Sequence, residues 1–103
     1  MANQANNDTG LLEKTRDKVT EPPRYSCVIY NDHFTTRDFV VYVLVKIFQL
    51  QEQDALKKMM DVHRSGKGKV GNYSYDIAAT KANEVVKLAQ DNDYPLKCTV
   101  EPL

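Results

Sequence analysis

The chain changes character at Tyr25, where a polar stretch gives way to regular patterns of apolar residues. Residues 1–24 contain few apolar side chains and close with a double proline. Such a segment buries too little apolar surface to offset the entropy that is lost when it becomes ordered. We therefore expect residues 1–24 to form a flexible arm and residues 25–103 to form one domain with a single core.

Three short segments of the domain have the composition of β-strands. Residues 25–31 are rich in aromatic and β-branched residues, residues 67–73 form a shorter run interrupted by glycine, and residues 96–102 alternate again. Because successive side chains of a strand point to opposite faces, Cys27 and Cys98 fall on the apolar faces of the first and third strands. Both thiols are therefore expected in the core, on neighbouring strands.

Between these strands the apolar residues recur at three- and four-residue spacing, which is typical of helices that bury one face. The first predicted helix covers residues 36–48, and Thr35 with Asp38 resembles a capping box at its start. The second covers about residues 53–63 and stops at a Ser-Gly pair. The third covers residues 75–91, with a serine in position to cap it.

The predicted order of elements is therefore β-α-α-β-α-β, a fold of the α+β class. With two helices between them, the first and second strands can run antiparallel. With one helix between them, the second and third strands run in the same direction. The simplest layout places the first strand in the middle, antiparallel to both neighbours. The sequence thus predicts a three-stranded antiparallel sheet of order 2-1-3, covered on one face by three helices.

Charge and composition disfavour several classes of protein. The chain has 14 basic and 14 acidic residues, whereas a dedicated nucleic-acid binder usually has a basic excess. No apolar run approaches the roughly 18 residues needed to cross a bilayer, and residues 1–10 lack the features of a secretory signal. We expect no nucleic-acid or membrane partner, and the two cysteines without a signal predict reduced thiols in the cytoplasm.

Motifs of known catalytic sites are absent from the sequence. There is no Gly-x-Ser-x-Gly, no phosphate-binding glycine loop and no His-Glu-x-x-His. The only histidines are His33, in the loop after the first strand, and His63, at the end of the second helix. With Asp32 they offer a candidate transition-metal site that lacks a further firm ligand. We therefore expect no enzymatic activity, no metal and no cofactor.

Four segments in chain order resemble the ClpS family of adaptors for the ATP-dependent Clp protease. Residues 28–40 contain the strand, the Asn-Asp loop and the start of the first helix, and residues 59–71 contain Met-Met-Asp-Val-His with the glycines that follow. Residues 79–82 resemble part of the third helix of the family. Residues 94–101 resemble its Pro-Leu-x-Cys-Thr-x-Glu ending. The likeness extends over about residues 25–101.

The resemblance implies an adaptor that binds the N-terminal segment of substrate proteins whose first residue is Leu, Phe, Tyr or Trp. It implies delivery of these substrates to the AAA+ unfoldase ClpA or ClpC, which works with the ClpP protease. An α-ammonium group has three donors and needs acceptors. The resemblance assigns that role to Asn31, Asp32 and His63. It assigns the pocket for the first side chain to Ile29, Thr35, Val40, Met59, Val62 and Leu96.

Contact with the unfoldase is assigned by the same resemblance to Asp76 and Lys81 of the third helix. Two positions of the pocket rim depart from the family pattern. His33 stands where the family usually has a second aspartate, and Arg37 stands where it usually has a methionine. Both changes make the rim less negative and leave the ammonium acceptors in place. We therefore expect the protein to bind N-terminal peptides, but with a specificity that differs from that of the family, as in a divergent paralogue.

Two other classes of function remain open from the sequence. The C-terminal domain of the ribosomal stalk protein has the same architecture, so a structural or interaction module of that kind fits the fold equally well. A small metal-binding or enzymatic domain would rest on Asp32, His33 and His63 alone. A stalk-like domain needs no site for an ammonium group, so convergence of Asn31 and Asp32 with His63 would favour the adaptor.

Overall fold

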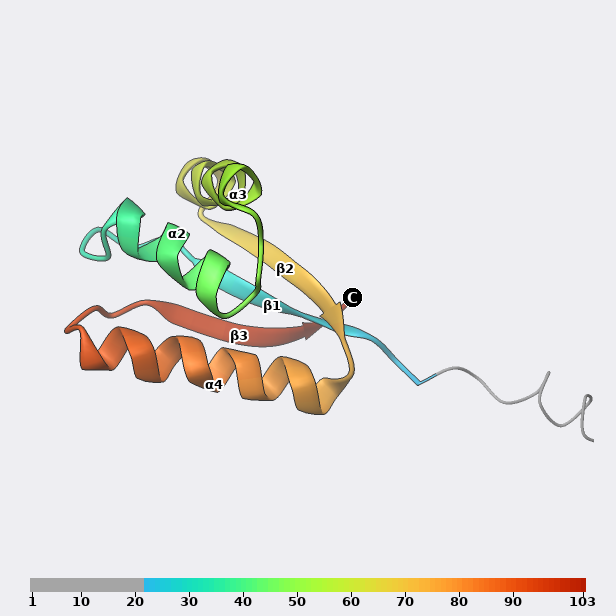
Figure 1. Ribbon diagram of the computed structural model, residues 1–103. Coiled ribbons are helices and arrows are strands. Elements are labelled where there is room, and N and C mark those ends of the chain that lie inside the picture. The colour runs from blue at the N-terminus through green and yellow to red at the C-terminus, as the bar shows by residue number, and fades with distance from the viewer. Residues whose placement is uncertain (1–21) are drawn as a thin grey trace, which may run out of the picture.

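The computed structural model describes residues 22–103, so most of the arm expected at residues 1–24 lies outside the described residues. The three strands form one antiparallel sheet of order β2-β1-β3. The predicted α+β fold and strand order are therefore confirmed. The elements, in chain order and as drawn in Figure 1, are β1 (Tyr25–Tyr30), α2 (Arg37–Lys46), α3 (Glu52–Ser65), β2 (Lys67–Tyr73), α4 (Tyr75–Asp91) and β3 (Lys97–Pro102).

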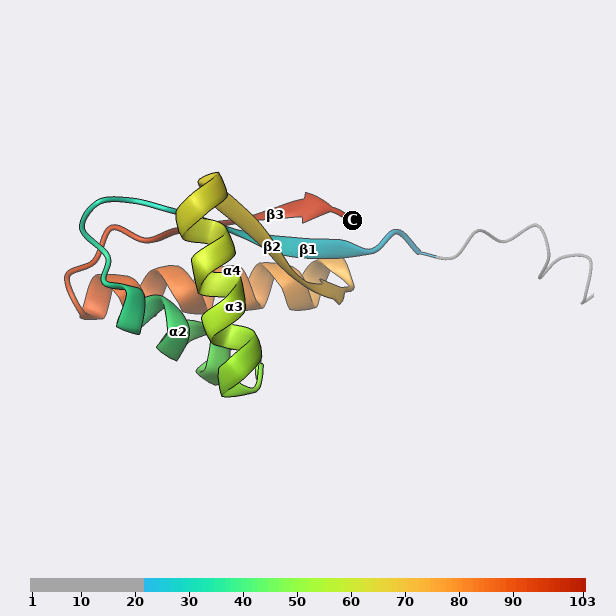
Figure 2. The ribbon, with the colours of Figure 1, turned by 90° about the horizontal axis from the view of Figure 1, so that it is seen from above.

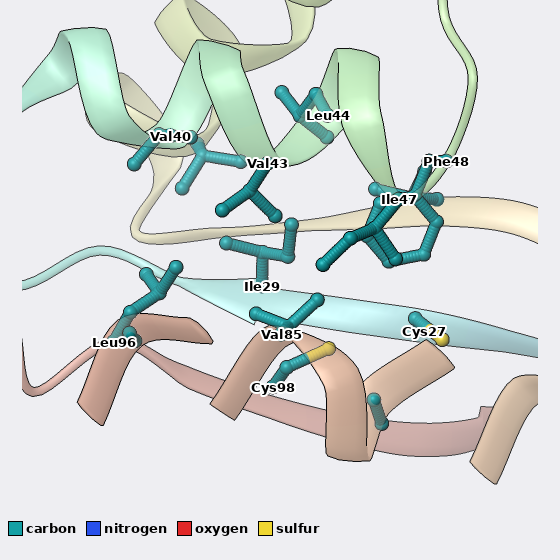
Figure 3. Close-up of a cluster of buried hydrophobic side chains, with 14 of the residues drawn as sticks. Cys27, Ile29, Val40, Val43, Leu44, Ile47, Phe48, Val85, Leu96 and Cys98 are labelled. Carbon is teal, nitrogen blue, oxygen red and sulfur yellow. The ribbon is translucent and has the colours of Figure 1, made fainter. Parts of the chain in front are cut away.

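The three described helices lie on the same side of the sheet and bury one shared core (Figure 2). At its centre, Val43 and Leu44 of α2 and Val85 of α4 gather around Ile29 of β1, and all four side chains are fully buried (Figure 3). Each large apolar side chain buried in this way contributes about 1.5–3 kcal/mol. Packing of this kind holds α2, whose many valines are poor helix formers. No helix among residues 22–103 combines the length and the apolar character needed to span a membrane.

The two cysteines predicted in the core are both buried free thiols. The Cys27 thiol donates to the Ala78 carbonyl oxygen at 3.3 Å, which joins β1 to α4. In the ladder between β1 and β3, Cys27 pairs with Val100 and Cys98 pairs with Ile29, so the two thiols are diagonal neighbours. A hydrogen bond with the Cys27 thiol, together with burial, raises the pKa of Cys98. Both residues therefore serve as small core residues.

Helix α2 starts one residue later than predicted because Thr36, rather than Thr35, is its N-cap. The Thr36 hydroxyl oxygen accepts a hydrogen bond from the backbone N–H of Phe39 at 3.2 Å. The predicted capping box of Thr35 and Asp38 is therefore wrong. The helix also ends earlier than the apolar pattern suggested, although the two apolar residues that follow it are still buried in the core.

A glycine turn joins α3 to β2 and lies against the end of β1. Gly66 ends α3 with φ at 94°, a left-handed conformation that favours glycine, and its N–H donates to the Val62 carbonyl at 2.9 Å. The Asn31 N–H donates to the Gly66 carbonyl at 2.8 Å. A Cβ at Gly68 would lie 2.8 Å from Val62 Cγ2, so only glycine lets β2 pass this close to α3.

The loop between β1 and α2 is held by the side chain of Asp32. Its Oδ1 accepts hydrogen bonds from the backbone N–H groups of Phe34 at 2.8 Å and Thr35 at 2.6 Å, and its Oδ2 accepts one from the Thr35 hydroxyl at 2.7 Å. Burial alone raises the pKa of Asp32, but these hydrogen bonds and the nearby His33 together hold the pKa below its usual value. The ionised carboxylate therefore stabilises the loop.

The variant Asp32→Asn tests this role, because it keeps the size of the side chain and removes its charge. The pKa of Asp32 is lower in the folded than in the unfolded chain, so its ionisation stabilises the fold above about pH 4. This contribution is lost as the pH falls through the folded-state pKa. We expect the variant to have a lower free energy of unfolding than the wild type at pH 7, and we expect this difference to shrink towards pH 3. Urea unfolding measures the free energy of both proteins at each pH, and a difference that does not change with pH would contradict the prediction.

A pair of substitutions on α2 tests the core. Leu44→Ala removes a fully buried side chain and should lower the free energy of unfolding by about 2–5 kcal/mol. Val45→Ala, at the exposed neighbouring position, should change it by less than about 1 kcal/mol. Urea unfolding followed by circular dichroism compares the two variants. An equal decrease in the free energy of unfolding in both variants would show that the Leu44 face of α2 is not packed in the core.

Candidate functional site

A small cavity lies at the end of β1, between the loop that follows this strand and the helices α2 and α3. Its volume is about 20 Å3, which is room for about one water molecule. Apolar side chains buried in the core form part of its wall, and polar side chains stand at its rim. The complete lining consists of Tyr30, Asn31, Asp32, Thr35, Arg37, Val40, Met59, Val62, His63 and Leu96.

Most residues that the resemblance assigned to a peptide site meet in this lining. All three ammonium acceptors are present, and so are five of the six pocket residues, namely Thr35, Val40, Met59, Val62 and Leu96. Ile29 is the exception, because it is fully buried beneath Val43 of α2 (Figure 3). Tyr30 is in the lining although the alternation of β1 gave no reason to expect it there.

The guanidinium of Arg37 and the imidazole of His63 are joined across the rim. Arg37 Nη2 lies 2.9 Å from His63 Nε2, and both side chains are exposed. An arginine has only donors, so Nε2 must accept this hydrogen bond. The ring is then neutral and carries its proton on Nδ1. A cation of the protein itself therefore occupies a nitrogen that the resemblance assigned to an ammonium group, and nothing in the sequence pattern predicted this bond.

A wider groove with a volume of about 730 Å3 adjoins the cavity. It shares with the cavity Asn31, Asp32, Thr35, Arg37 and His63. It also includes His33, Phe34, Thr36 and Asp38. His33, expected at the rim, thus faces the groove and not the cavity. Phe34 is 78 % exposed there, an apolar side chain that was not assigned to the site from the sequence.

The candidate metal ligands Asp32, His33 and His63 do not form a metal centre. Over residues 22–103, no three His, Cys, Asp or Glu side chains are grouped closely enough to hold a metal ion. The oxygens of Asp32 accept hydrogen bonds from its own loop. The guanidinium bonded to His63 Nε2 also places a positive charge where a metal would have to bind.

The residues assigned to the unfoldase contact lie on α4 and differ in their surroundings. Asp76 is exposed in the first turn of α4. Lys81 is half-buried, and its Nζ donates to the Ile47 carbonyl at 2.8 Å and lies 5.4 Å from the centroid of the Tyr73 ring. Lys81 therefore satisfies a carbonyl at the C-terminal end of α2, a structural role that its sequence position did not reveal.

Comparison with known proteins gives consistent matches along the chain. The family model for the ATP-dependent Clp protease adaptor protein ClpS matches residues 20–99. The Clp protease adaptor ClpS of Syntrophus aciditrophicus is 46 % identical over 96 residues, which cover 93 % of this chain and 90 % of that protein. The ClpS of Myxococcus xanthus is 41 % identical, with 99 % of this chain and 97 % of that protein covered.

A solved structure shares the fold as well as the sequence. Agrobacterium tumefaciens ClpS2, bound to L-phenylalaninamide, superposes with a TM-score of 0.78 and 37 % identity, covering 81 % of this chain and 100 % of that one. Sequence identity of this extent decides against a ribosomal-stalk-like module, because that alternative rests on a shared architecture alone. The chain belongs to the ClpS family of ATP-dependent Clp protease adaptor proteins.

Proposed function

We propose that this protein binds the N-terminal segment of substrate proteins by its free α-amino group and its large apolar first residue, Leu, Phe, Tyr or Trp. The observation that carries the proposal is the meeting of Asn31, Asp32 and His63 at the rim of a cavity with an apolar wall. The Asn31 amide oxygen and His63 Nε2 offer acceptors for an α-ammonium group, and Asp32 offers a negative charge. The phenylalaninamide bound to the Agrobacterium relative, an amine beside an apolar side chain, supports the proposal.

The cavity has to widen before a first residue can enter it. A volume of about 20 Å3 is too small for the four carbons of a leucine side chain. All four apolar wall residues lie in the buried core, but among them Met59 alone has a flexible, unbranched side chain. Arg37, at the rim, is long and exposed. We therefore expect Met59 and Arg37 to move when a peptide binds, so the apolar pocket is not preformed at full size.

The delivery step is assigned to the other end of the molecule. We propose that Asp76 contacts the AAA+ unfoldase, ClpA or ClpC, which feeds the ClpP protease. Tyr75 and Ile77, on either side of it, are 55 % and 51 % exposed, and exposed apolar side chains of this size favour a protein interface. Lys81, which the resemblance also assigns to this contact, lies on the same helix, where its Nζ donates to the Ile47 carbonyl. The protein then acts as an adaptor in the cytoplasm, with no catalysis of its own.

The free α-amino group should be essential for peptide binding. Peptides beginning with Leu, Phe, Tyr or Trp should bind, and their N-acetylated forms should not, because acetylation removes the charge and two of the donors that the acceptors need. Fluorescence anisotropy with peptides labelled at the C-terminal end measures this. Equal affinity for free and acetylated peptides would refute the proposed function.

Two variants locate this binding on the structure. Asn31→Ala and His63→Ala should each weaken binding about ten- to a hundredfold, since one hydrogen bond to a charged group contributes about 1.5–3 kcal/mol. Asp91→Ala, an exposed position at the end of α4, is the matched control and should bind normally. Unchanged affinity in either test variant, with the fold verified by circular dichroism, would remove that residue from the site.

Residues 1–24 are proposed to act in delivery and not in capture. Of these, Arg24 is tied to the fold, since its Nε and Nη2 donate to the Asn72 side chain and backbone at 2.9 and 3.0 Å. A chain that begins at Pro22 keeps these bonds. It should bind peptides with the affinity of the full chain and fail to promote their degradation by the unfoldase and protease. Full degradation with the shortened chain would contradict this assignment.

A further inference from the structure

The rim of the cavity contains a competitor for the substrate. A neutral imidazole has one acceptor nitrogen, and in this protein His63 Nε2 already accepts from Arg37 Nη2 at 2.9 Å. The same nitrogen cannot accept a hydrogen bond from an incoming α-ammonium group at the same time. The two positive charges would also repel each other at this short distance. Binding of an N-terminus by His63 therefore requires that the guanidinium of Arg37 leaves.

The nearby carboxylates of the loop and of α2 are weak alternative partners for the Arg37 guanidinium. The carboxylate of Asp32 accepts three hydrogen bonds from Phe34 and Thr35, which fixes it to its own turn. Asp38 is the next residue of α2, and side chains at adjacent helix positions do not face each other. A displaced guanidinium is best stabilised by a carboxylate that comes from outside, with which it can form two parallel hydrogen bonds.

The second residue of a bound peptide is in the right place to supply that carboxylate. In an extended chain, successive side chains point to opposite sides, so the second side chain points away when the first enters the cavity. The Cα atoms of the two residues are only 3.8 Å apart. The groove that adjoins the cavity includes Arg37 and His63 in its lining. A second side chain in this groove lies within reach of the Arg37 guanidinium.

From this geometry we propose that Arg37 is a gate that selects N-terminal segments with Asp or Glu as the second residue. The inference rests on the proposed function and adds the class of substrate. In the free protein the guanidinium holds His63 Nε2. In the complex the carboxylate of the second residue holds the guanidinium, and Nε2 accepts from the α-ammonium group. A neutral or basic second residue leaves the displaced guanidinium without this partner, so such a peptide binds more weakly.

Matched peptides separate the charge from the size of the second residue. The peptides begin with Leu-Glu or Leu-Gln and are otherwise identical, and their affinities are measured by anisotropy for the wild type, Arg37→Met and Arg64→Met. The wild type should prefer Glu over Gln about two- to fivefold at low salt, the range of an exposed ion pair, and less at high salt. Arg37→Met should bring the ratio close to one and bind the Gln peptide more tightly than the wild type does.

Arg64 is the control, because it is an exposed arginine next to His63 that lines neither the cavity nor the groove. Arg64→Met makes the same change in net charge and should keep the wild-type ratio. A ratio that is the same in Arg37→Met as in the wild type would overturn the gate. If the wild type binds free-amine and acetylated peptides equally, the proposed function fails instead.

A second readout needs no peptide. Nitrogen-15 NMR of the His63 ring in the free protein should show the proton on Nδ1 in the wild type and in Arg64→Met, since the partner of one ring nitrogen decides which nitrogen is protonated. In Arg37→Met this bias should be lost. An unchanged His63 spectrum in Arg37→Met would overturn the gate, whatever the peptides do.

Discussion

The backbone hydrogen bond from the Asn31 N–H to the Gly66 carbonyl, 2.8 Å long, joins the end of the central strand to the turn after α3. Asn31 continues from β1, and Gly66 closes the helix that carries His63. The bond forms only because Gly66 takes a left-handed conformation and turns the chain directly into β2. It continues the β1–β2 ladder one step beyond the pair of Tyr30 and Lys67, and so sets the loop after β1 against the end of α3. The candidate site therefore depends on a glycine that lines neither the cavity nor the groove.

The free protein satisfies its site with its own groups. Asp32 accepts hydrogen bonds from its own loop, and His63 accepts one from Arg37. The apolar side chains leave a cavity of only about 20 Å3. This is the state that packing favours, because an open apolar cavity forfeits dispersion contacts and unpaired polar groups are costly. A ligand must replace these internal contacts with better ones. Selectivity then comes from which internal contacts a ligand can replace, as much as from the shape of the pocket.

The order of elements and the strand order followed from the spacing of apolar residues, because one buried face sets the period of each helix and strand. The family could be identified because its motifs are fixed strings of residues. Local competition was harder to foresee. Thr35 and Thr36 are adjacent residues of the same type. The Thr35 hydroxyl donates a hydrogen bond to Asp32, and the Thr36 hydroxyl caps α2.

The contacts of long side chains were the least predictable part of the site. Arg37 and His63 are 26 residues apart, and a hydrogen bond between them depends on where each side chain ends, not on a pattern. The resemblance assigned Lys81 to the unfoldase contact, and nothing in its position on α4 indicated its hydrogen bond to the Ile47 carbonyl, which depends on how α2 ends nearby. The cavity volume depends on all ten lining side chains at once. These properties come from tertiary packing, which a single sequence specifies without displaying.

The two proposed contacts lie at opposite ends of β1. Asn31 follows the last residue of the strand, whereas the ring of Tyr25, at its start, lies 5.2 Å from the ring of Tyr75 at the start of α4. Six residues of strand span about 20 Å, so a peptide at Asn31 does not obstruct a partner at Asp76. Arg24, whose carbonyl accepts a hydrogen bond from the Leu103 N–H at 2.9 Å, directly precedes Tyr25, so the chain enters the fold at the Tyr75 end (Figure 1). Since the arm joins the domain beside the proposed unfoldase contact and away from the peptide site, one partner can engage both the arm and α4 while the substrate stays bound.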